Sequence, residues 1–414
     1  MKAPKVEYAL SANGLRMVHL LLPGAAAGFF GVATRVGSRN ETPDYYGLAH
    51  FVEHTLFKGT TSRSAWHIIN RMERVGGELN AYTTKEETVV YTVFPGSSPA
   101  RALDLVADLI MHSRFPESEL RKEREVVADE INSYLDSPSE AVYDDFEELI
   151  YAGTPLSHNI LGEAHLLRGF TPEVCCEYLQ HWYRPSNMVV FYAGSMSASR
   201  VFAAVEKTFS PLEGSAPVQE ECAPVSAAPF SKLKEIDSHQ AHTVMGVLTG
   251  GMHSETRYAQ ALLTNILGGP GMNSLLNVAL RERRGLVYTV EASTALLSDT
   301  GLFTVYYGCD PADNAVCASL VKQQLEHMAD SSLSSRTLEM YKKQYLGQLK
   351  VAYENRESRI LGIARATLMS GRSLTPSEIE RRIKDVGPEE LRQCAQTLCE
   401  CSLLTLGPRE TSMI

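Results

Sequence analysis

The most informative stretch of the chain reads Gly47-Leu48-Ala49-His50-Phe51-Val52-Glu53-His54-Thr55-Leu56-Phe57-Lys58-Gly59-Thr60. On a helix, residues four positions apart lie on one face with Cβ atoms about 5–6 Å apart, so His50 and His54 are neighbours. Two imidazoles so placed can bind one metal ion at about 2 Å. Glu53 can then take a proton from metal-bound water without being a ligand. The stretch predicts a zinc-binding helix that carries a general base.

The residues around this pattern strengthen the prediction. A His-x-x-Glu-His spelling alone occurs by chance in about one chain of this kind in thirty. Here Ala49, Val52, Leu56 and Phe57 place apolar side chains around the two histidines. A surface helix would not need that much apolar cover, so we expect a helix packed into a core.

The length of 414 residues predicts two or three domains. Residues 211–230 contain four prolines and few large apolar side chains, which is typical of an extended linker. We therefore expect a zinc-binding domain at 1–210 and a second domain at 231–414.

The two halves repeat one layout of a strand, a helix, two β-rich runs and a further helix. In the first half the strand lies at 29–36, the β-rich runs at 79–84 and 88–94, and the last helix at 99–111. In the second half the strand lies at 243–248, the first helix at 258–267, an additional helix at 274–284, the runs at 287–294 and 302–307, and the last helix at 311–328. This pattern predicts an α+β fold of two duplicated domains, each a mixed or antiparallel sheet with helices on one side. Only the first half carries the His pattern, so the chemistry is expected there.

A catalytic zinc takes three protein ligands and leaves one position for water. The best candidate for the third ligand lies in a helix predicted at 119–134, where Glu123 and Glu130 are two turns apart on one face. From spacing alone, a solvated charged helix is about as good an interpretation.

The combination of His50-Phe51-Val52-Glu53-His54, Phe57-Lys58-Gly59-Thr60 and Glu123-Arg124-x-x-Val127-x-x-Glu130 resembles the pitrilysin/insulinase family of inverted-motif zinc peptidases. It is most similar to the branch of short subunits that includes mitochondrial processing peptidase and bacterial processing proteases. The resemblance covers nearly the whole chain.

The resemblance implies roles for the acidic and imidazole side chains. His50, His54 and Glu130 would bind one Zn²⁺ per chain, and Glu53 would be the general base. Glu123 would orient a ligand histidine through its far ring nitrogen.

The segment 76–88 resembles the family's edge strand, which can bind an extended peptide by strand addition. Asn80 and Ala81 on this strand would then bind the substrate backbone. Without the neighbouring His helix, ordinary hairpin residues would be the preferred interpretation.

In the second half, Leu280-Arg281-Glu282-Arg283-Arg284-Gly285-Leu286-Val287-Tyr288 matches another signature of the family. Gly285 is placed to end a helix. The resemblance implies that Tyr288 stabilises the oxyanion and that Arg281 anchors a substrate carbonyl. The alternative for Arg281 is complementation of a helix dipole at the C-terminus. Residues 268–274 resemble the family's glycine-rich loop and lack the ending of a nucleotide-binding loop.

Because one short chain carries both signatures, the resemblance implies a homodimer in which Arg281 and Tyr288 of one subunit complete the zinc site of the other. Glu140 and Asp144 match positions where the mitochondrial relative binds a substrate arginine, which implies a peptide substrate with basic residues. A solvated acidic helix is a slightly better interpretation of this pair. Two rival functions stay open: a non-catalytic structural or peptide-binding relative, and an enzyme that needs a different partner subunit.

The net charge of −10 argues against a nucleic-acid binder. No apolar run reaches the roughly 18 residues of a membrane helix, and the N-terminus does not resemble a signal peptide. We therefore expect no membrane span and a cytoplasmic location.

Overall fold

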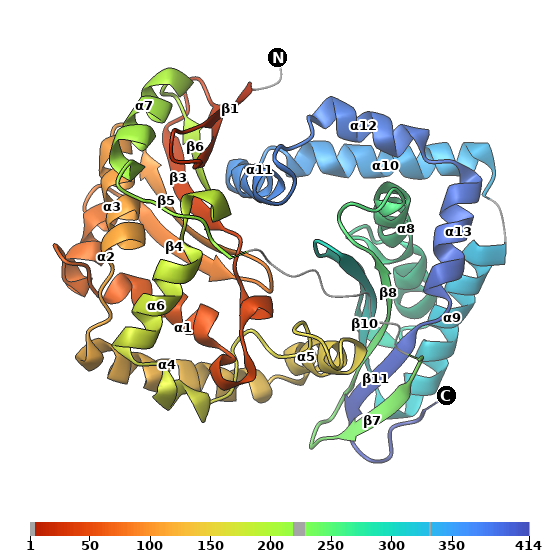
Figure 1. The fold of residues 1–414 in the computed structure, drawn as a ribbon. Helices are drawn as coiled ribbons and strands as arrows, with labels where there is room; N and C mark the ends of the chain where they lie inside the picture. Colours follow the sequence, from red (N-terminus) through yellow and green to blue (C-terminus); the bar gives the residue numbers. More distant parts are fainter. Residues whose placement is uncertain (1–4, 218–227, 331–332, 414) are drawn as a thin grey trace. The chain divides into compact units, whose positions relative to one another are not determined.

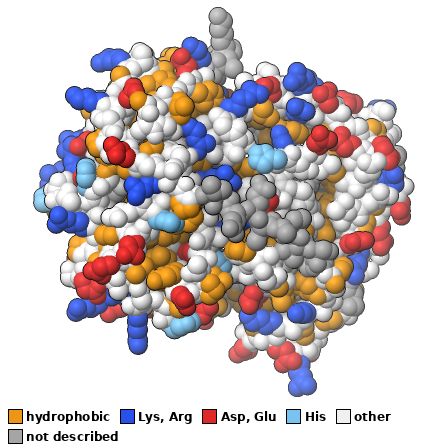
Figure 2. Space-filling view, in the orientation of Figure 1, with side chains coloured by type: hydrophobic (Ala, Val, Ile, Leu, Met, Phe, Trp, Pro, Cys, Tyr) orange, Lys and Arg blue, Asp and Glu red, His pale blue; other side chains and the backbone are white. Residues whose placement is uncertain are grey.

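The computed structural model describes residues 5–217, 228–330 and 333–413 (Figure 1). The chain divides into two compact units, and each is assembled from three separate segments. The first unit combines Met1–Asn132, His158–Glu220 and Tyr353–Leu374, and the second combines Ser133–Ser157, Glu221–Ala352 and Thr375–Ile414. In Figure 2, acidic and basic side chains are interspersed over the visible face.

A six-stranded sheet forms the centre of the first unit. Its strands, in spatial order, are β1 (Val6–Leu10), β2 (Arg16–Leu21), β6 (Met188–Gly194), β3 (Ala27–Thr34), β5 (Thr88–Pro95) and β4 (Glu78–Thr83). Only β2 and β6 are parallel, and all other neighbours are antiparallel. Strand β4 pairs only with β5, so it is an edge of the sheet.

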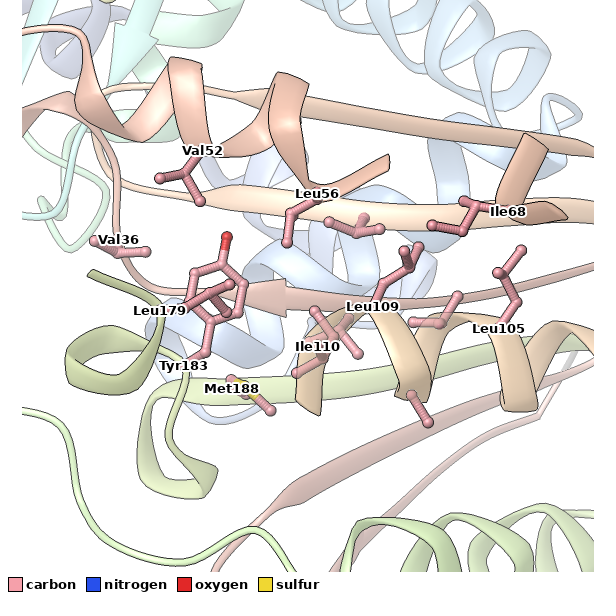
Figure 3. Packing of buried hydrophobic residues seen from close by; sticks show 14 of the residues in the cluster. Val36, Val52, Leu56, Ile68, Leu105, Leu109, Ile110, Leu179, Tyr183 and Met188 are labelled. Carbon is pink, nitrogen blue, oxygen red and sulfur yellow. The ribbon is translucent and has the colours of Figure 1, made fainter. Parts of the chain in front are cut away.

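One face of this sheet carries the main helical layer of the unit. The helices are α1 (Leu48–Thr55), α2 (Ala65–Glu73), α3 (Pro99–His112), α4 (Glu117–Leu135), α6 (Pro172–Trp182) and α7 (Ala198–Phe209). Val52 and Leu56, from α1 and the turn after it, point into the same core as Leu109 of α3 (Figure 3). Each is essentially inaccessible to solvent. Fully burying such a side chain contributes about 1.5–3 kcal/mol, so the core fixes α1 against the sheet.

The other face of the first sheet is covered by a helix from near the end of the chain. Helix α11 (Arg356–Ser370) packs Ile360 and Leu368 against Val18, Phe29 and Phe191 of the sheet. Tyr91 of β5 also donates a hydrogen bond to Glu357 at 2.7 Å.

The second unit repeats this arrangement. Its sheet has the order β7 (Ser231–Glu235), β11 (Ser402–Gly407), β8 (Ala241–Gly250), β10 (Thr300–Cys309) and β9 (Val287–Leu296). Again one pair, β7 and β11, is parallel, and β9 is an edge. The order matches β2-β6-β3-β5-β4 of the first sheet strand for strand. Helices α8 (Arg257–Gly268), α9 (Asn314–Asp330) and α13 (Pro388–Leu398) form the core on one face. The unit also contains α10 (Ser335–Ala352) and α12 (Pro376–Asp385).

The opposite face of the second sheet is covered by α5 (Pro138–Ile150), a helix encoded in the first half of the sequence. Phe146 of α5 lies so close to the sheet that a Cβ on Gly246 would meet its ring at 2.9 Å and the Phe303 carbonyl at 2.7 Å. Gly246 therefore allows the close approach of the helix to β8.

The structure confirms two sheet-plus-helix halves, and it changes how they are built. The main helical layer lies on one face of each sheet, as expected. The second face, however, is covered by one helix from the other half of the sequence, so the compact units differ from the contiguous ranges 1–210 and 231–414. Part of the expected linker, 218–227, lies outside the described residues. Within the described residues, no helix is long and apolar enough to cross a membrane.

Candidate metal centre

Helix α1 begins at the buried carboxylate of Glu41, which lies a few residues before the His pattern. Glu41 accepts hydrogen bonds from the backbone N–H of Gly47 at 2.9 Å and of Ala49 at 2.6 Å. A negative charge at a helix N-terminus is stabilised by the unpaired N–H groups and by the helix dipole. Gly47 itself has φ = +95°, a conformation that favours glycine. These contacts fix the start of the helix three residues before His50.

Glu41 is held in turn by His158, whose Nε2 lies 3.0 Å from its carboxylate. The ring of His158 stacks on Tyr46 at a centroid distance of 3.7 Å. Burial raises the pKa of Glu41, and the hydrogen bonds from His158 and from the helix lower it. Three hydrogen-bonding groups, two backbone N–H groups and the His158 ring, therefore hold the carboxylate in place.

Three possible metal ligands come together where α1 meets α4. Glu130 Oε2 lies 3.4 Å from Nε2 of His54 and 3.8 Å from Nε2 of His50. Two ligands bound at about 2.0–2.1 Å to one tetrahedral ion stand about 3.3–3.5 Å apart. One donor atom from each of the three residues lies within 4.8 Å of the others. Two imidazole nitrogens and a carboxylate oxygen are a donor set that suits zinc and leaves a position for water.

The protonation of the two histidines differs because their surroundings differ. Burial and the neighbouring His54 lower the pKa of His50 to about 3, so its ring is neutral and its Nε2 lone pair is free for a metal. Burial opposes protonation of His54 as well, yet the hydrogen bond to Glu123 and nearby carboxylates raise its pKa. The ring of His54 therefore lies in a strongly negative environment.

Glu123 of α4 lies behind His54, on the side away from Glu130. Its Oε1 is 3.0 Å from Nδ1 of His54, and its Oε2 is 2.7 Å from Nζ of Lys58. Although burial acts in the other direction, the hydrogen bonds from His54 and Lys58 lower the pKa of Glu123. A carboxylate at this position favours the tautomer that leaves the Nε2 lone pair of His54 available to a metal ion. Nδ1 of His50, by contrast, is buried without a hydrogen-bond partner among the described residues.

Glu53 points from α1 toward the edge strand β4. The hydroxyl of Thr83 donates a hydrogen bond to its Oε2 at 2.9 Å. Burial raises the pKa of Glu53, as does the charge of Glu130, while Thr83 and His54 lower it. A raised pKa brings a carboxylate closer to the range in which a general base works well. Asn80 and Ala81 lie on the same edge strand, half-buried.

Arg281 and Tyr288 belong to the second unit. Arg281 lies on a π-helical turn, Asn277–Glu282, and Tyr288 is 77% exposed on the edge strand β9. Gly285 has φ = +66° and donates its N–H to the Arg281 carbonyl at 2.8 Å, ending the helix where the sequence predicted. Arg281, the glycine-rich loop at 268–272 and residues 289–292 line a pocket of about 330 Å³.

Glu140 and Asp144 also belong to the second unit, where both lie on α5. Glu140 is exposed, and Asp144 is half-buried. Asp144 makes a hydrogen bond with the Tyr134 hydroxyl, and burial and that contact raise the pKa of Tyr134. The structure thus brings His50, His54, Glu130, Glu53 and Glu123 together in the first unit, and it places the four remaining charged and aromatic candidates in the second.

Sequence reasoning missed three residues of the centre: Lys58, Thr83 and Glu41. Lys58 follows His54 by four positions, so the helical period could have pointed to it. Thr83 lies in the segment already recognised as an edge strand. Glu41 carries no local signal, because its contacts with the helix and with His158 exist only in the folded chain.

Two family models match most of the chain. Residues 22–164 match the family model described as insulinase (peptidase family M16), and residues 169–345 match the model described as peptidase M16 inactive domain. Helix α1 and Glu130 fall within the first match, and Arg281 and Tyr288 fall within the second.

Relatives of similar length carry names that agree with the family match. An "uncharacterized zinc protease" of Streptomyces coelicolor is 31% identical over 96% of this chain and 88% of its own length. The "uncharacterized zinc protease YmxG" of Bacillus subtilis is 32% identical over 93% of this chain and 94% of its own length.

Two solved structures share the fold. A protease from Helicobacter pylori aligns with a TM-score of 0.88 and 22% identity over 98% of this chain and all of that one. A Pseudomonas fluorescens protein described as peptidase M16 inactive domain aligns with a TM-score of 0.89 and 17% identity over 98% of each chain. From the full-length relatives and the two family matches together, the chain belongs to the insulinase family of peptidases, peptidase family M16.

Proposed function

We propose that the protein is a zinc metalloendopeptidase that cleaves unfolded peptides. The observation that carries the proposal is the convergence of His50, His54 and Glu130 with Glu53 beside them. His50, His54 and Glu130 would hold the zinc ion, which when bound would supply a Lewis acid. A family name alone does not establish catalysis, so the proposal rests on the complete set of ligand and base side chains.

In this proposal Glu53 moves the protons of the reaction. Its carboxylate accepts the proton of the attacking water and passes it to the nitrogen of the leaving amine. The hydrogen bond from Thr83 occupies Oε2, which leaves Oε1 to face the reacting atoms. Glu123 and Lys58 act indirectly by fixing the ring of His54.

We further propose that β4 binds the substrate as an added strand. The strand is an edge of its sheet, and Thr83 at its end contacts the proposed base. Main-chain hydrogen bonds along Asn80 and Ala81 would hold an extended peptide independently of its sequence. N-methylation of single backbone amides in a peptide substrate tests this: cleavage should fall steeply at alternate positions, and equal tolerance at all positions would argue against strand addition.

Arg281 and Tyr288 are proposed to act across a homodimer, with those of one subunit completing the zinc site of the other. Tyr288 would donate a hydrogen bond to the oxyanion, and Arg281 would bind a substrate carbonyl. Their high exposure leaves both side chains available for such contacts. Glu140 and Asp144 would bind a basic residue of the peptide.

The decisive test compares Glu53→Gln with the unchanged protein on quenched peptides in the presence of zinc. We expect a loss of activity of at least about 100-fold with zinc content preserved, because the base is removed and the ligands stay. Glu125→Gln, on the exposed face of α4, is the matched control and should retain activity. Activity that survives Glu53→Gln would defeat the mechanism.

The same assay separates the rival functions. A chain that binds zinc and cleaves no peptide alone, yet cleaves when a second family subunit is added, would be one half of a heterodimer. A chain without activity under either condition would be a non-catalytic relative. Peptides with and without arginine test the substrate class, since Glu140→Ala should reduce any preference for arginine and leave arginine-free peptides unaffected.

A further inference from the structure

A pocket rich in arginine lies on the first unit, where α2 meets α3. Its volume is about 230 Å³, and four guanidinium groups line it, those of Arg63, Arg71, Arg74 and Arg101. None of the described lining residues is acidic. In Figure 2, Lys, Arg and His side chains gather at the left edge of the view, where α2 lies in Figure 1. The metal-centre residues are absent from the lining, so the pocket is a separate feature.

The guanidinium groups outnumber the carboxylates that neutralise them. Arg63 pairs with both Asp104 and Asp108, and Arg71 pairs with Asp104 at 2.7 Å. No carboxylate within ion-pair distance of Arg74 or Arg101 occurs among the described residues. Counting the four arginines against the two aspartates leaves an excess of two positive charges at the pocket.

The two arginines without carboxylate partners are nevertheless held in place. Nη1 of Arg101 donates a hydrogen bond to the Arg71 carbonyl at 2.9 Å. The guanidinium of Arg74 lies 4.9 Å from the centre of the Trp66 ring, which is itself half exposed. Such contacts fix the orientation of the planar groups before any ligand arrives, which reduces the entropy lost on binding.

We propose that this pocket binds a small phosphate-bearing anion. A phosphate group carries a charge of about −1.5 to −2 at neutral pH, which matches the excess of two positive charges. Its several oxygens can accept the paired N–H groups that each guanidinium presents. The asparagine at position 70 adds a neutral hydrogen-bonding group to the lining. This proposal is independent of the proposed peptidase function.

Calorimetric titration of the full-length, zinc-loaded protein with inorganic phosphate and with inorganic triphosphate tests the proposal, in a phosphate-free buffer at constant ionic strength. We expect one saturable site per chain and at least about tenfold weaker binding in Arg74→Gln. Arg200→Gln is the control, because it removes the same charge from an exposed position on α7. Arg74 contacts the Trp66 ring at the surface, so its variant should fold, and circular dichroism verifies this. Arg101→Gln provides a second variant.

Each outcome decides the question. Saturable binding that weakens in Arg74→Gln and Arg101→Gln and persists in Arg200→Gln supports the pocket. Binding that is equally strong in Arg74→Gln would place the anion elsewhere, including at the metal, and would overturn the proposal. Absence of saturable binding by either anion overturns it too. A titration with succinate forms the last arm, since equal affinity for this dicarboxylate would refute the preference for phosphate.

Discussion

At the scale of single residues, the candidate metal centre is supported by side chains behind the proposed ligands. His54 contacts Glu123, and Glu123 contacts Lys58. His50 has no equivalent support at Nδ1 among the described residues. The two histidines should therefore respond differently to the loss of their surroundings, and the support of His54 can be tested without touching a ligand.

We predict that Glu123→Gln weakens zinc binding by about 10- to 100-fold, because the charge that fixes the His54 ring is lost. Glu130→Gln, which removes a proposed ligand, should weaken binding further. Competition with a chromophoric chelator measures both affinities, and Glu125→Gln on the same helix is the control. If Glu123→Gln binds zinc as tightly as the control, the contact with His54 does not support the metal.

The limits of sequence reasoning are clearest at this scale. Helical spacing was sufficient to place His50, Glu53 and His54 on one surface of α1. Helical spacing could not decide whether Glu130 is a metal ligand. A carboxylate on a charged helix has the same sequence pattern whether it faces water or a metal. Glu41 could not be inferred at all, since it reaches the helix through a fold-dependent contact with Gly47 and Ala49.

At the scale of elements, the contact between α11 and the first sheet includes a buried acid. Glu87 is 2% exposed, and its Oε1 lies 3.5 Å from Nε of Arg365 on α11. Burial raises the pKa of Glu87 to about 6, and Arg365 only partly offsets it. The folded protein therefore holds the Glu87 proton more tightly than the unfolded chain, whose pKa is near the ordinary value.

The raised pKa of Glu87 makes the free energy of unfolding depend on pH in one direction. Because the folded state binds more protons between about pH 4.5 and 6, the free energy of unfolding falls as pH rises through that window. We predict that the free energy of unfolding of Glu87→Gln falls less between pH 4.5 and pH 7 than that of the unchanged protein, by about 1–2 kcal/mol. The variant therefore gains stability relative to the unchanged protein above pH 6. Urea unfolding of chelator-treated protein at pH 4.5 and pH 7 measures it. An identical pH dependence in both proteins would contradict the prediction, and Glu125→Gln controls for charge loss.

The sequence predicted most elements of the two sheets, because buried strands and amphipathic helices leave a periodic pattern. The runs at 79–84 and 88–94 correspond to β4 and β5, and the charged helix at 119–134 corresponds to α4. The sheet against which each helix packs could not be predicted from the sequence. An amphipathic pattern shows that α5 and α11 bury one face, and it contains no information on which sheet they cover.

At the scale of the whole molecule, the proposed homodimer makes a prediction about mixed variants. Glu53→Gln and Tyr288→Phe should each be nearly inactive alone. If subunits complete one another's sites, a mixed dimer contains one intact site, and an equimolar mixture should recover about a quarter of the unchanged activity after subunit exchange. Peptide cleavage as a function of mixing ratio measures this. Absence of recovery, with exchange verified by differently tagged chains, would refute the shared site.

Helix α11, from near the end of the chain, covers the first sheet, whereas α5, from the first half of the sequence, covers the second. This arrangement determines when the first unit can finish folding during synthesis. All strands of the first sheet have left the ribosome once Gly194 has emerged, whereas the helix that covers Val18, Phe29 and Phe191 ends at Ser370. At about 5–20 residues per second, this apolar surface waits on the order of ten to thirty seconds for its cover. This apolar face of the first sheet is therefore uncovered while about two fifths of the chain is synthesised, and the first unit is completed only after α11 has emerged.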